Sequence, residues 1–303
     1  DEWFIQPRRK TMANTSFSGP VRSKGNFKLF TETASTGLDS DRTLGTTAKD
    51  ARRVYLDEWF LQRPGLNANI DQVSTVEVQR ALNRNWEALG TNMTTALATF
   101  ATTSAGILAT TAGADQDQAI LTPHLDTAAT AWAGCLWGTE NETHFETSIM
   151  LPAIDNQKVW AGLKLTNDQL VATDANQVFF KFQTDATNSE AFTDFTKLHF
   201  VHSIGGTDYI SQLPITVAAN TPYHLKITID SDRKASIFVN GVQYNVTTTS
   251  GSTGGTAVTT GTTPSTALTD DIDLIPYVGI EAGAAAAEAV NCHYVCCSRN
   301  VYE

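Results

Sequence analysis

The sequence is poor in charge and in cysteine. Only 17% of its 303 residues are Asp, Glu, Lys or Arg, and the net charge is −11. Binding to the phosphate backbone of nucleic acid rests on clustered Lys and Arg, so this balance argues against a nucleic-acid partner. The one basic cluster, residues 8–10, is typical of a solvated tail. Four cysteines are too few for a scaffold held together by disulfides.

Long apolar runs and secretion signals are missing as well. No stretch reaches 18 apolar residues, and no segment combines the basic, apolar and small-residue regions of a signal peptide. We therefore expect a protein made in a reducing cytoplasm, without a membrane partner.

Catalytic and metal-binding motifs are also absent from the sequence. There is no GxSxG, GxGxxG, Walker loop or HExxH, and Asp271 and Asp273 lack the third carboxylate of the sandwich glycosidases. Residues 292–297, CHYVCC, resemble a metal cluster, but on a strand Cys292 and Cys296 would share a face about 13 Å apart, at ~3.3 Å per residue. One zinc ion cannot hold both, so we interpret these thiols as small buried core residues. We expect no enzyme, no metal and no cofactor.

The clearest structural pattern lies in residues 222–246. Residues 225–229, LKITI, alternate strictly between apolar and polar, which predicts a strand with one buried face. Residues 230–233 have turn chemistry, and the alternation resumes at Ala235. Asn240 and Gly241 then predict a two-residue hairpin turn. This meander requires a second sheet to cover its apolar face.

Further strand candidates fill the chain after Trp86, most of them bounded by Gly, Asn, Asp or Pro. They are residues 97–103, 106–111, 131–137, 144–151, 159–166, 177–184, 198–203, 209–213, 274–281 and 290–297. Many short strands without intervening helices predict an antiparallel sandwich or barrel, with a large jelly roll as the natural size class. Residues 247–269, 18 of 23 being Thr, Ser or Gly, predict a long exposed loop that is either a tolerated insertion or a polar contact surface.

The N-terminal region differs from this body. Residues 1–65 keep no regular period and predict an extended arm ordered by a partner surface, and residues 66–89 contain a short amphipathic helix stripe. The segment DEWFIQ at residues 1–6 recurs as DEWFLQ at residues 57–62. Adjacent Trp and Phe side chains are favoured interface anchors, so the repeat is either a pair of docking segments or local packing and chance. We assign residues 90–303 to the sandwich.

Several stretches resemble the virion structural proteins of tailed bacteriophages, especially those of marine and cyanobacterial hosts. They are residues 85–92 (NWEALGTN), 132–141 (WAGCLWGTEN), 159–166 (VWAGLKLT), 203–208 (SIGGTD), 229–235 (IDSDRKA) and 271–280 (DIDLIPYVGI). Residues 14–21, NTSFSGPV, resemble the N-termini of small phage head proteins. The resemblance implies a body like the concanavalin A-like (laminin G-like) jelly roll, an all-β antiparallel sandwich. It supplies no catalytic motif.

The resemblance implies a virion structural protein, and our leading hypothesis is a capsid decoration or cement protein on the outer surface of the phage head. We expect it to be a homotrimer bound to the major capsid protein. We expect the arm to dock through the aromatic residues Trp3, Phe4, Phe17, Phe27, Trp59 and Phe60. The alternative is an adhesin on a fibre that binds a glycan of the host surface. For that function we expect Tyr244 and Tyr277 to contact the sugar, beside residues 247–269.

Overall fold

The computed structural model describes residues 53–61, 64–66, 86–102, 105–123, 137–185, 190, 192–251 and 254–300. By its internal contacts the chain divides into residues 1–51 and residues 52–303, and the described residues belong to the second unit. Among them the chain forms two sheets and a 3-10 turn, η2 (Thr95–Leu97). No helix of this part is long and apolar enough to cross a membrane.

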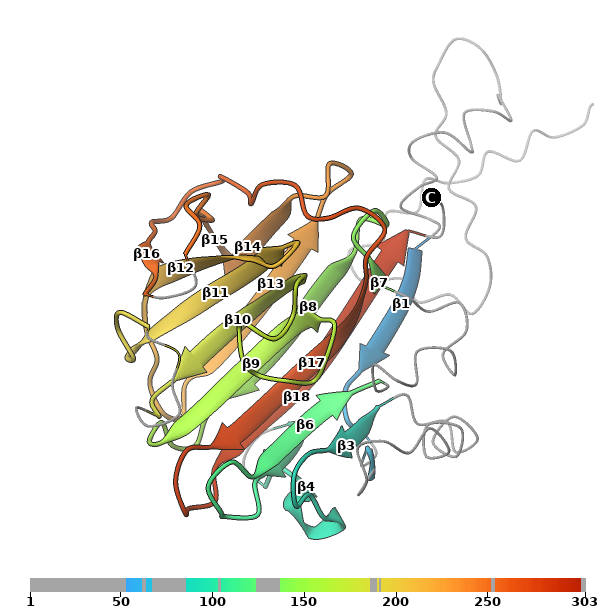
Figure 1. Cartoon of the computed structure of the whole chain (residues 1–303). Coiled ribbons are helices and arrows are strands. Elements are labelled where there is room, and N and C mark those ends of the chain that lie inside the picture. The colour runs from blue at the N-terminus through green and yellow to red at the C-terminus, as the bar shows by residue number, and fades with distance from the viewer. Residues whose placement is uncertain are drawn as a thin grey trace, which may run out of the picture. The chain divides into compact units, whose positions relative to one another are not determined.

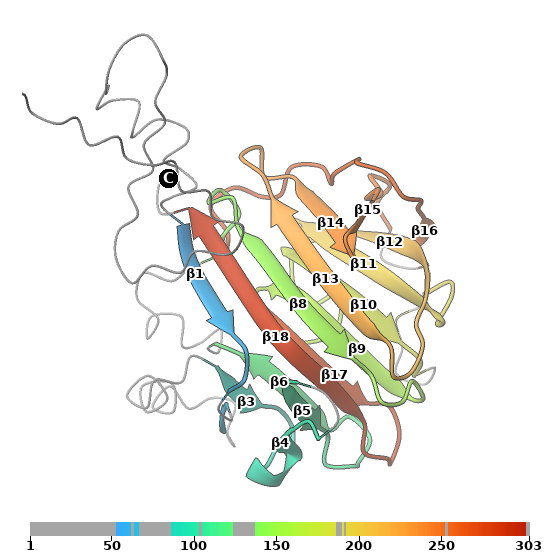
Figure 2. The same ribbon diagram turned by 180° about the vertical axis from the view of Figure 1, so that it is seen from behind.

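The first sheet has eight strands. They are β1 (Arg53–Glu58), β4 (Ala98–Phe100), β5 (Ile107–Thr110), β8 (His144–Met150), β13 (Pro222–Ile229), β14 (Ala235–Val239), β15 (Val242–Tyr244) and β18 (Ala289–Asn300). The spatial order is β15-β14-β13-β8-β18-β5-β4, and β1 pairs with the other half of β18. Figure 2 shows β14, β13, β8, β18 and β1 side by side.

The second sheet has ten strands. They are β2 (Gly65–Leu66), β3 (Glu87–Leu89), β6 (Gln118–Thr122), β7 (Trp137–Gly138), β9 (Gln157–Lys164), β10 (Gln177–Gln183), β11 (Lys197–Ile204), β12 (Thr207–Thr216), β16 (Thr256–Ala257) and β17 (Asp273–Ala282). Its order is β16-β12-β11-β10-β9-β17-β6-β3-β2, with β7 beside β17. It lies in front of the first sheet in Figure 1. All strand pairs in the two sheets are antiparallel except β12–β16 and β2–β3.

The predicted all-β sandwich of the jelly-roll class is therefore confirmed. The alternation in β13 places Tyr223, Leu225, Ile227 and Ile229 in the core, while the residues between them are half-buried or exposed. The hairpin turn after β14 also forms as predicted. Asn240 has a φ of 51° and Gly241 a φ of 79°, the left-handed backbone that a type I′ turn requires.

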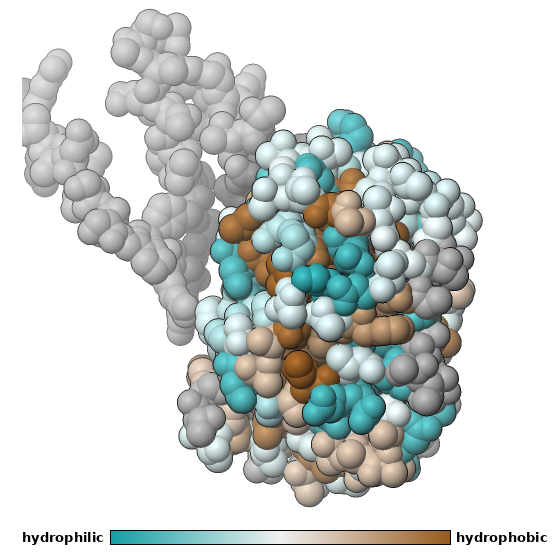
Figure 3. Space-filling model, turned by 90° about the vertical axis from the view of Figure 1, so that its left-hand side faces the viewer, coloured by the Kyte–Doolittle hydropathy of each residue, from teal (hydrophilic) through white to brown (hydrophobic). Residues whose placement is uncertain are grey.

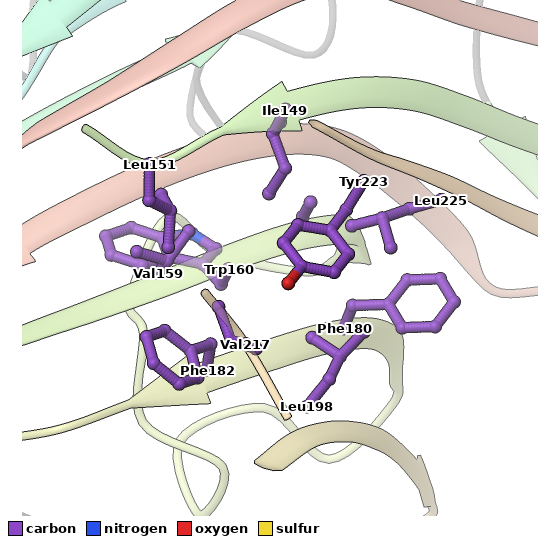
Figure 4. A pocket seen from close by; sticks show the side chains of 11 residues that line it. Ile149, Leu151, Val159, Trp160, Phe180, Phe182, Leu198, Val217, Tyr223 and Leu225 are labelled. Carbon is purple, nitrogen blue, oxygen red and sulfur yellow. The ribbon is translucent and has the colours of Figure 1, made fainter. Parts of the chain in front are cut away.

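The core between the sheets is closely packed. A cavity of about 10 Å³ lies between β8 and β13 on one side and β9, β10 and β11 on the other (Figure 4). Its lining residues are all aliphatic or aromatic, and its volume is at the limit for one water molecule. This cavity has no room for a ligand.

The boundary between arm and sandwich lies earlier in the chain than residue 65. Strand β1 pairs with β18 from Arg53↔Asn300 to Glu58↔Val295, and Phe60 is 2% exposed in the core. Residues 53–61 are therefore part of the sandwich. Of the predicted connector, residues 67–85 lie outside the described part, and its two ends are strands β2 and β3.

The prediction for the cysteines was partly wrong. A β-bulge between Cys292 and Tyr294 shifts the register of β18 against β8. Cys292 and Cys297 are buried, as expected for core thiols, but Cys296 lies on the opposite face from Cys292 and is half-buried. The two thiols therefore do not share a face, because the bulge inserts one residue between them.

Most of the described residues of the Thr-rich segment 247–269 are exposed, as predicted for a long loop, but parts of it are fixed to the sandwich. Its backbone N–H groups bond to the edge of the sandwich at Ser265 (to the Ala235 carbonyl, 2.9 Å) and Leu268 (to the Arg233 carbonyl, 2.8 Å). Both residues are buried, and β16 within the segment pairs with β12. Strand β15 pairs only with residues 237–239 of β14, so the carbonyls of Ala235 and Arg233 lie beyond its end and take their hydrogen bonds from the loop. Figure 3 views this side, where pale residues of intermediate hydropathy cover much of the surface.

Candidate functional site

Four of the predicted docking residues, Trp3, Phe4, Phe17 and Phe27, lie outside the described part of the chain. The structure separates the other two. Trp59 is 53% exposed, so its ring is available to a partner. Phe60 is buried, and its backbone N–H donates to the Glu58 carboxylate at 2.7 Å. The prediction that Phe60 anchors the arm to a partner was therefore wrong, because this side chain fills the core of its own sandwich.

The two predicted glycan contacts are also corrected. Tyr244 is 9% exposed and Tyr277 is 0% exposed, and both belong to the hydrophobic core. Tyr277 lies on β17, which is buried along nearly its whole length. Neither ring can meet a sugar in solution, so a glycan site must be built from other residues.

An exposed aromatic cluster lies on the outer face of the eight-stranded sheet. We call it the aromatic platform and define it as Trp59, Glu146, His224, Lys226 and Tyr294. The Trp59 ring stacks on Tyr294 with ring centroids 4.8 Å apart and 29° between the planes. The centroid of the His224 ring lies 5.9 Å from the centroid of the same Tyr294 ring. Tyr294 thus holds the indole in place, while more than half of Trp59 stays open to solvent.

Strand register explains how these residues meet. On β8 and β13 inward residues are buried and outward residues are at least partly exposed. On β18 the outward residues Tyr294 and Cys296 are half-buried. Glu146 is opposite Lys226 on β13 and opposite Cys296 on β18. Ser148, two residues further on, is opposite His224 and Tyr294. Outward residues of three neighbouring strands therefore form one surface.

The Glu146 carboxylate is the polar centre of the platform. Its Oε1 accepts a hydrogen bond from the Tyr294 hydroxyl at 3.0 Å and lies 2.9 Å from His224 Nε2. Its Oε2 lies 3.7 Å from Lys226 Nζ. Burial alone would raise the pKa of Glu146, but the hydrogen bonds from His224 and Tyr294 and the nearby positive charge hold it below its usual value. Glu146 is therefore a carboxylate at neutral pH.

A second cluster of charged residues lies on the ten-stranded sheet and is closed to solvent. Three fully buried lysines, Lys158, Lys164 and Lys181, project from β9 and β10. Lys158 Nζ lies 2.6 Å from Glu281 and 3.3 Å from Asp185, Lys164 Nζ lies 3.0 Å from Asp174, and Lys181 pairs with Glu190. We call these seven residues the lysine network.

The lysine network fastens loops to the sheet. Lys181 donates to the backbone carbonyl and to Oε1 of Gln169, both at 2.8 Å, which holds the β9–β10 loop down. Burial lowers the pKa of Lys181 to about 8, against the opposing charge of Glu190. Lysines and carboxylates are the groups of acid–base chemistry, but none of them lines the cavity described above. In the described residues no group of three His, Cys, Asp or Glu is placed to hold a metal ion.

Comparisons with known proteins concern the fold. No family model matches the sequence, and no curated protein matches it. Solved structures with a similar fold include an alginate lyase A1-II′ of family 7 (14% identity, 70% of this chain and 84% of that chain, TM-score 0.43). Another is the Crh5 transglycosylase (11% identity, 82% of this chain and 84% of that chain, TM-score 0.41). A third is the carbohydrate-binding module CBM66 from Bacillus subtilis (8% identity, 69% of this chain and 91% of that chain, TM-score 0.34).

These comparisons correct one prediction. The missing motifs led us to expect no enzyme, but a lyase and a transglycosylase are among the similar structures. That expectation is contradicted by these findings. At these identities and TM-scores the comparisons assign no activity, and function has to be argued from the residues of this chain.

Proposed function

We propose that this protein binds carbohydrate and that the aromatic platform receives the sugar. The observation that carries the proposal is the exposed Trp59 ring, with one face stacked on Tyr294. The apolar C–H face of a pyranose ring packs well on a flat aromatic surface. Because the indole is already held in place, little side-chain entropy is lost on binding.

Polar groups of the aromatic platform suit sugar hydroxyls. Glu146 Oε2 and Lys226 Nζ are 3.7 Å apart, beyond a direct hydrogen bond, so one hydroxyl can accept from the lysine and donate to the carboxylate. His224 borders the same carboxylate. The protein carries a net charge of −11, which disfavours acidic polymers, so we propose a neutral glycan as the ligand.

The test is binding to neutral polysaccharides and glycan arrays by the intact chain and by Trp59→Ala. A loss of about 1.4 kcal/mol of stacking corresponds to tenfold weaker binding, and we expect at least this for Trp59→Ala. Glu146→Gln should weaken binding while leaving the Trp59 ring in place. The control is Leu61→Ala, because Leu61 is 87% exposed and lies outside the platform. Equal binding by Trp59→Ala and Leu61→Ala would refute the proposal.

A second candidate function is attachment to a partner protein, as a decoration protein bound to the major capsid protein of a phage head. A separate observation favours it. In the described part of the chain six large hydrophobic residues are exposed, and three of them (Tyr55, Trp59 and Leu61) lie on or beside β1. Strand β1 is an edge strand, and exposed apolar residues on an edge are typical of a protein interface. The homotrimer and the virion location remain predictions.

Cosedimentation with undecorated capsids separates this function from sugar binding. We expect Tyr55→Ser with Leu61→Ser to abolish capsid binding and to leave glycan binding unchanged. The matched control is Val242→Ser, since Val242 is also exposed (44%) but lies on β15, at the opposite edge of the sheet. If the intact chain and both variants fail to sediment with capsids, this second function is ruled out.

A further inference from the structure

The repeated segment of the sequence has a structural explanation at one of its two copies. Residues 1–6 read DEWFIQ and residues 57–62 read DEWFLQ, so five of six positions are identical. Residues 57–61 are described and lie along β18, with Asp57 opposite Cys296 and Glu58 opposite Val295. The contacts of the second copy therefore show what a DEWF segment binds.

Each of the first four shared residues, DEWF, has a defined contact. Asp57 Oδ1 accepts a hydrogen bond from the Cys296 thiol at 2.7 Å. Glu58 accepts from the backbone N–H of Phe60, which stabilises a backbone turn with a φ of 50° at that residue. Trp59 stacks on Tyr294, and Phe60 enters the core.

The one difference between the two copies lies at the most exposed of these positions. Leu61 corresponds to Ile5 and is 87% exposed, the largest exposure among the large hydrophobic residues of the described chain. A change from Leu to Ile there removes no burial. Residues 1–4 thus carry every side chain that the β18 edge contacts in residues 57–60.

We propose that residues 1–6 of one chain bind the β18 edge of a second copy, in place of that copy's residues 57–62. Within one chain the site is already filled by residues 57–60, so a duplicate adds nothing there. Between chains the same duplicate links two molecules by segment exchange. Residues 7–56 separate the two copies and span up to about 170 Å when extended, more than the diameter of a domain. This inference does not depend on sugar binding.

Of the two bound forms, the one with the chain's own segment has the lower free energy. In an exchange, the contacts of Asp57, Glu58, Trp59 and Phe60 are replaced by the same contacts from residues 1–4. The chain's own segment is also continuous with residues 53–56 of β1, which make further contacts. There Arg53 donates to Asn300 Oδ1 at 2.9 Å and to the Glu142 carbonyl at 2.6 Å, and Leu56 is buried. A chain in dilute solution therefore keeps its own segment, and exchange requires crowding or a weakened segment.

The experiment weakens the chain's own segment with Trp59→Ala and Phe60→Ala in the full chain. We expect this variant to form concentration-dependent dimers by light scattering and to regain thermal stability as the concentration rises. Adding Trp3→Ala and Phe4→Ala should abolish both effects. The matched control adds Phe17→Ala and Phe27→Ala instead, which also removes two aromatic rings of the N-terminal region. Monomers at every concentration, or dimers that persist without Trp3 and Phe4, would overturn the proposal.

A peptide measurement covers the case in which the double variant does not fold. A fluorescent peptide of residues 1–12 is added to the single variant Trp59→Ala, whose own segment is weakened but whose core residue Phe60 is intact. Its anisotropy is compared with that of the same peptide carrying Trp3→Ala and Phe4→Ala. We expect at least tenfold tighter binding of the unaltered peptide, and loss of that binding when excess unlabelled peptide of residues 53–64 is added. Equal binding of the two peptides would refute the exchange.

Discussion

Two buried histidines predict that the sandwich loses stability in mild acid. His202 is 0% exposed, lies between Phe200 (5.9 Å) and Tyr209 (4.6 Å), and neither of its ring nitrogens has a hydrogen-bond partner. Burial lowers its pKa from 6.5 to about 3. His199, stacked on Phe192 at 4.3 Å, has its pKa lowered by burial to about 4.

The sign and size of this stability loss follow from the linkage between proton binding and folding. A histidine whose pKa is lower in the folded state binds its proton more readily in the unfolded chain. Stability is therefore complete above pH 6.5 and is lost as the pH falls toward the folded pKa. At pH 5, which is 1.5 units below 6.5, each histidine costs about 2 kcal/mol at ~1.4 kcal/mol per unit, or about 4 kcal/mol for both. That is a large share of the ~5–15 kcal/mol that stabilises a typical domain.

The assay is urea unfolding at pH 8 and at pH 5. Between pH 8 and pH 5 we expect the two histidines to lower the free energy of unfolding of the wild-type chain by about 4 kcal/mol. In His202→Phe this histidine-dependent loss should be about half as large. Taking the difference between the two pH values removes the packing cost of the substitution. Tyr209→Phe is the control, because it alters the same stack and leaves both histidines in place. If His202→Phe and wild type lose the same free energy between pH 8 and pH 5, the histidines do not cause the acid sensitivity.

Three further predictions concern other parts of the sandwich. Glu190→Gln leaves the Lys181 charge buried without its partner and should cost about 3–5 kcal/mol in urea unfolding, whereas replacing both residues by apolar ones should cost much less; equal costs would contradict this. Gly241→Ala places a Cβ at a φ of 79° and should lower the free energy of urea unfolding by about 1 kcal/mol. An unchanged unfolding midpoint would refute the claim that this turn position requires glycine. Burial and the hydrogen bond to Asp57 raise the pKa of Cys296, so Asp57→Asn should speed its labelling by iodoacetamide, followed by mass spectrometry; slower labelling would contradict the assigned cause.

The strands could be predicted wherever burial leaves a period in the sequence. In β13 and β14 one face is buried and the other is open, so apolar and polar residues alternate and the boundaries fall close to the observed ones. Strand β1 was missed, because residues 53–58 lie next to a long stretch without regular period. The bulge in β18 leaves no mark in composition, so it could not be foreseen from the sequence.

The aromatic platform was predictable only in part. Trp59 stands out as an aromatic residue in a polar segment. Its partners on β8, β13 and β18 do not, because Glu146 meets residues 78 and 148 positions later in the chain. Such contacts depend on the order of strands in the sheet, which hydrophobic period does not encode. Tyr244 and Tyr277 failed as predictions for the related reason that an isolated Tyr does not reveal which side of a strand is covered.

The position of β18 has a consequence for how the chain folds during synthesis. This strand, the last of those described, lies inside the eight-stranded sheet and pairs with β1, β5 and β8. Until the ribosome has made residues 289–300, β8 has one neighbour in that sheet and β1 has none. The first sheet therefore closes late, through pairings of long sequence separation, which are intrinsically slow to form. In the interval the open edge of β8 is exposed to other nascent chains, and chaperone binding at that stage would protect it from aggregation.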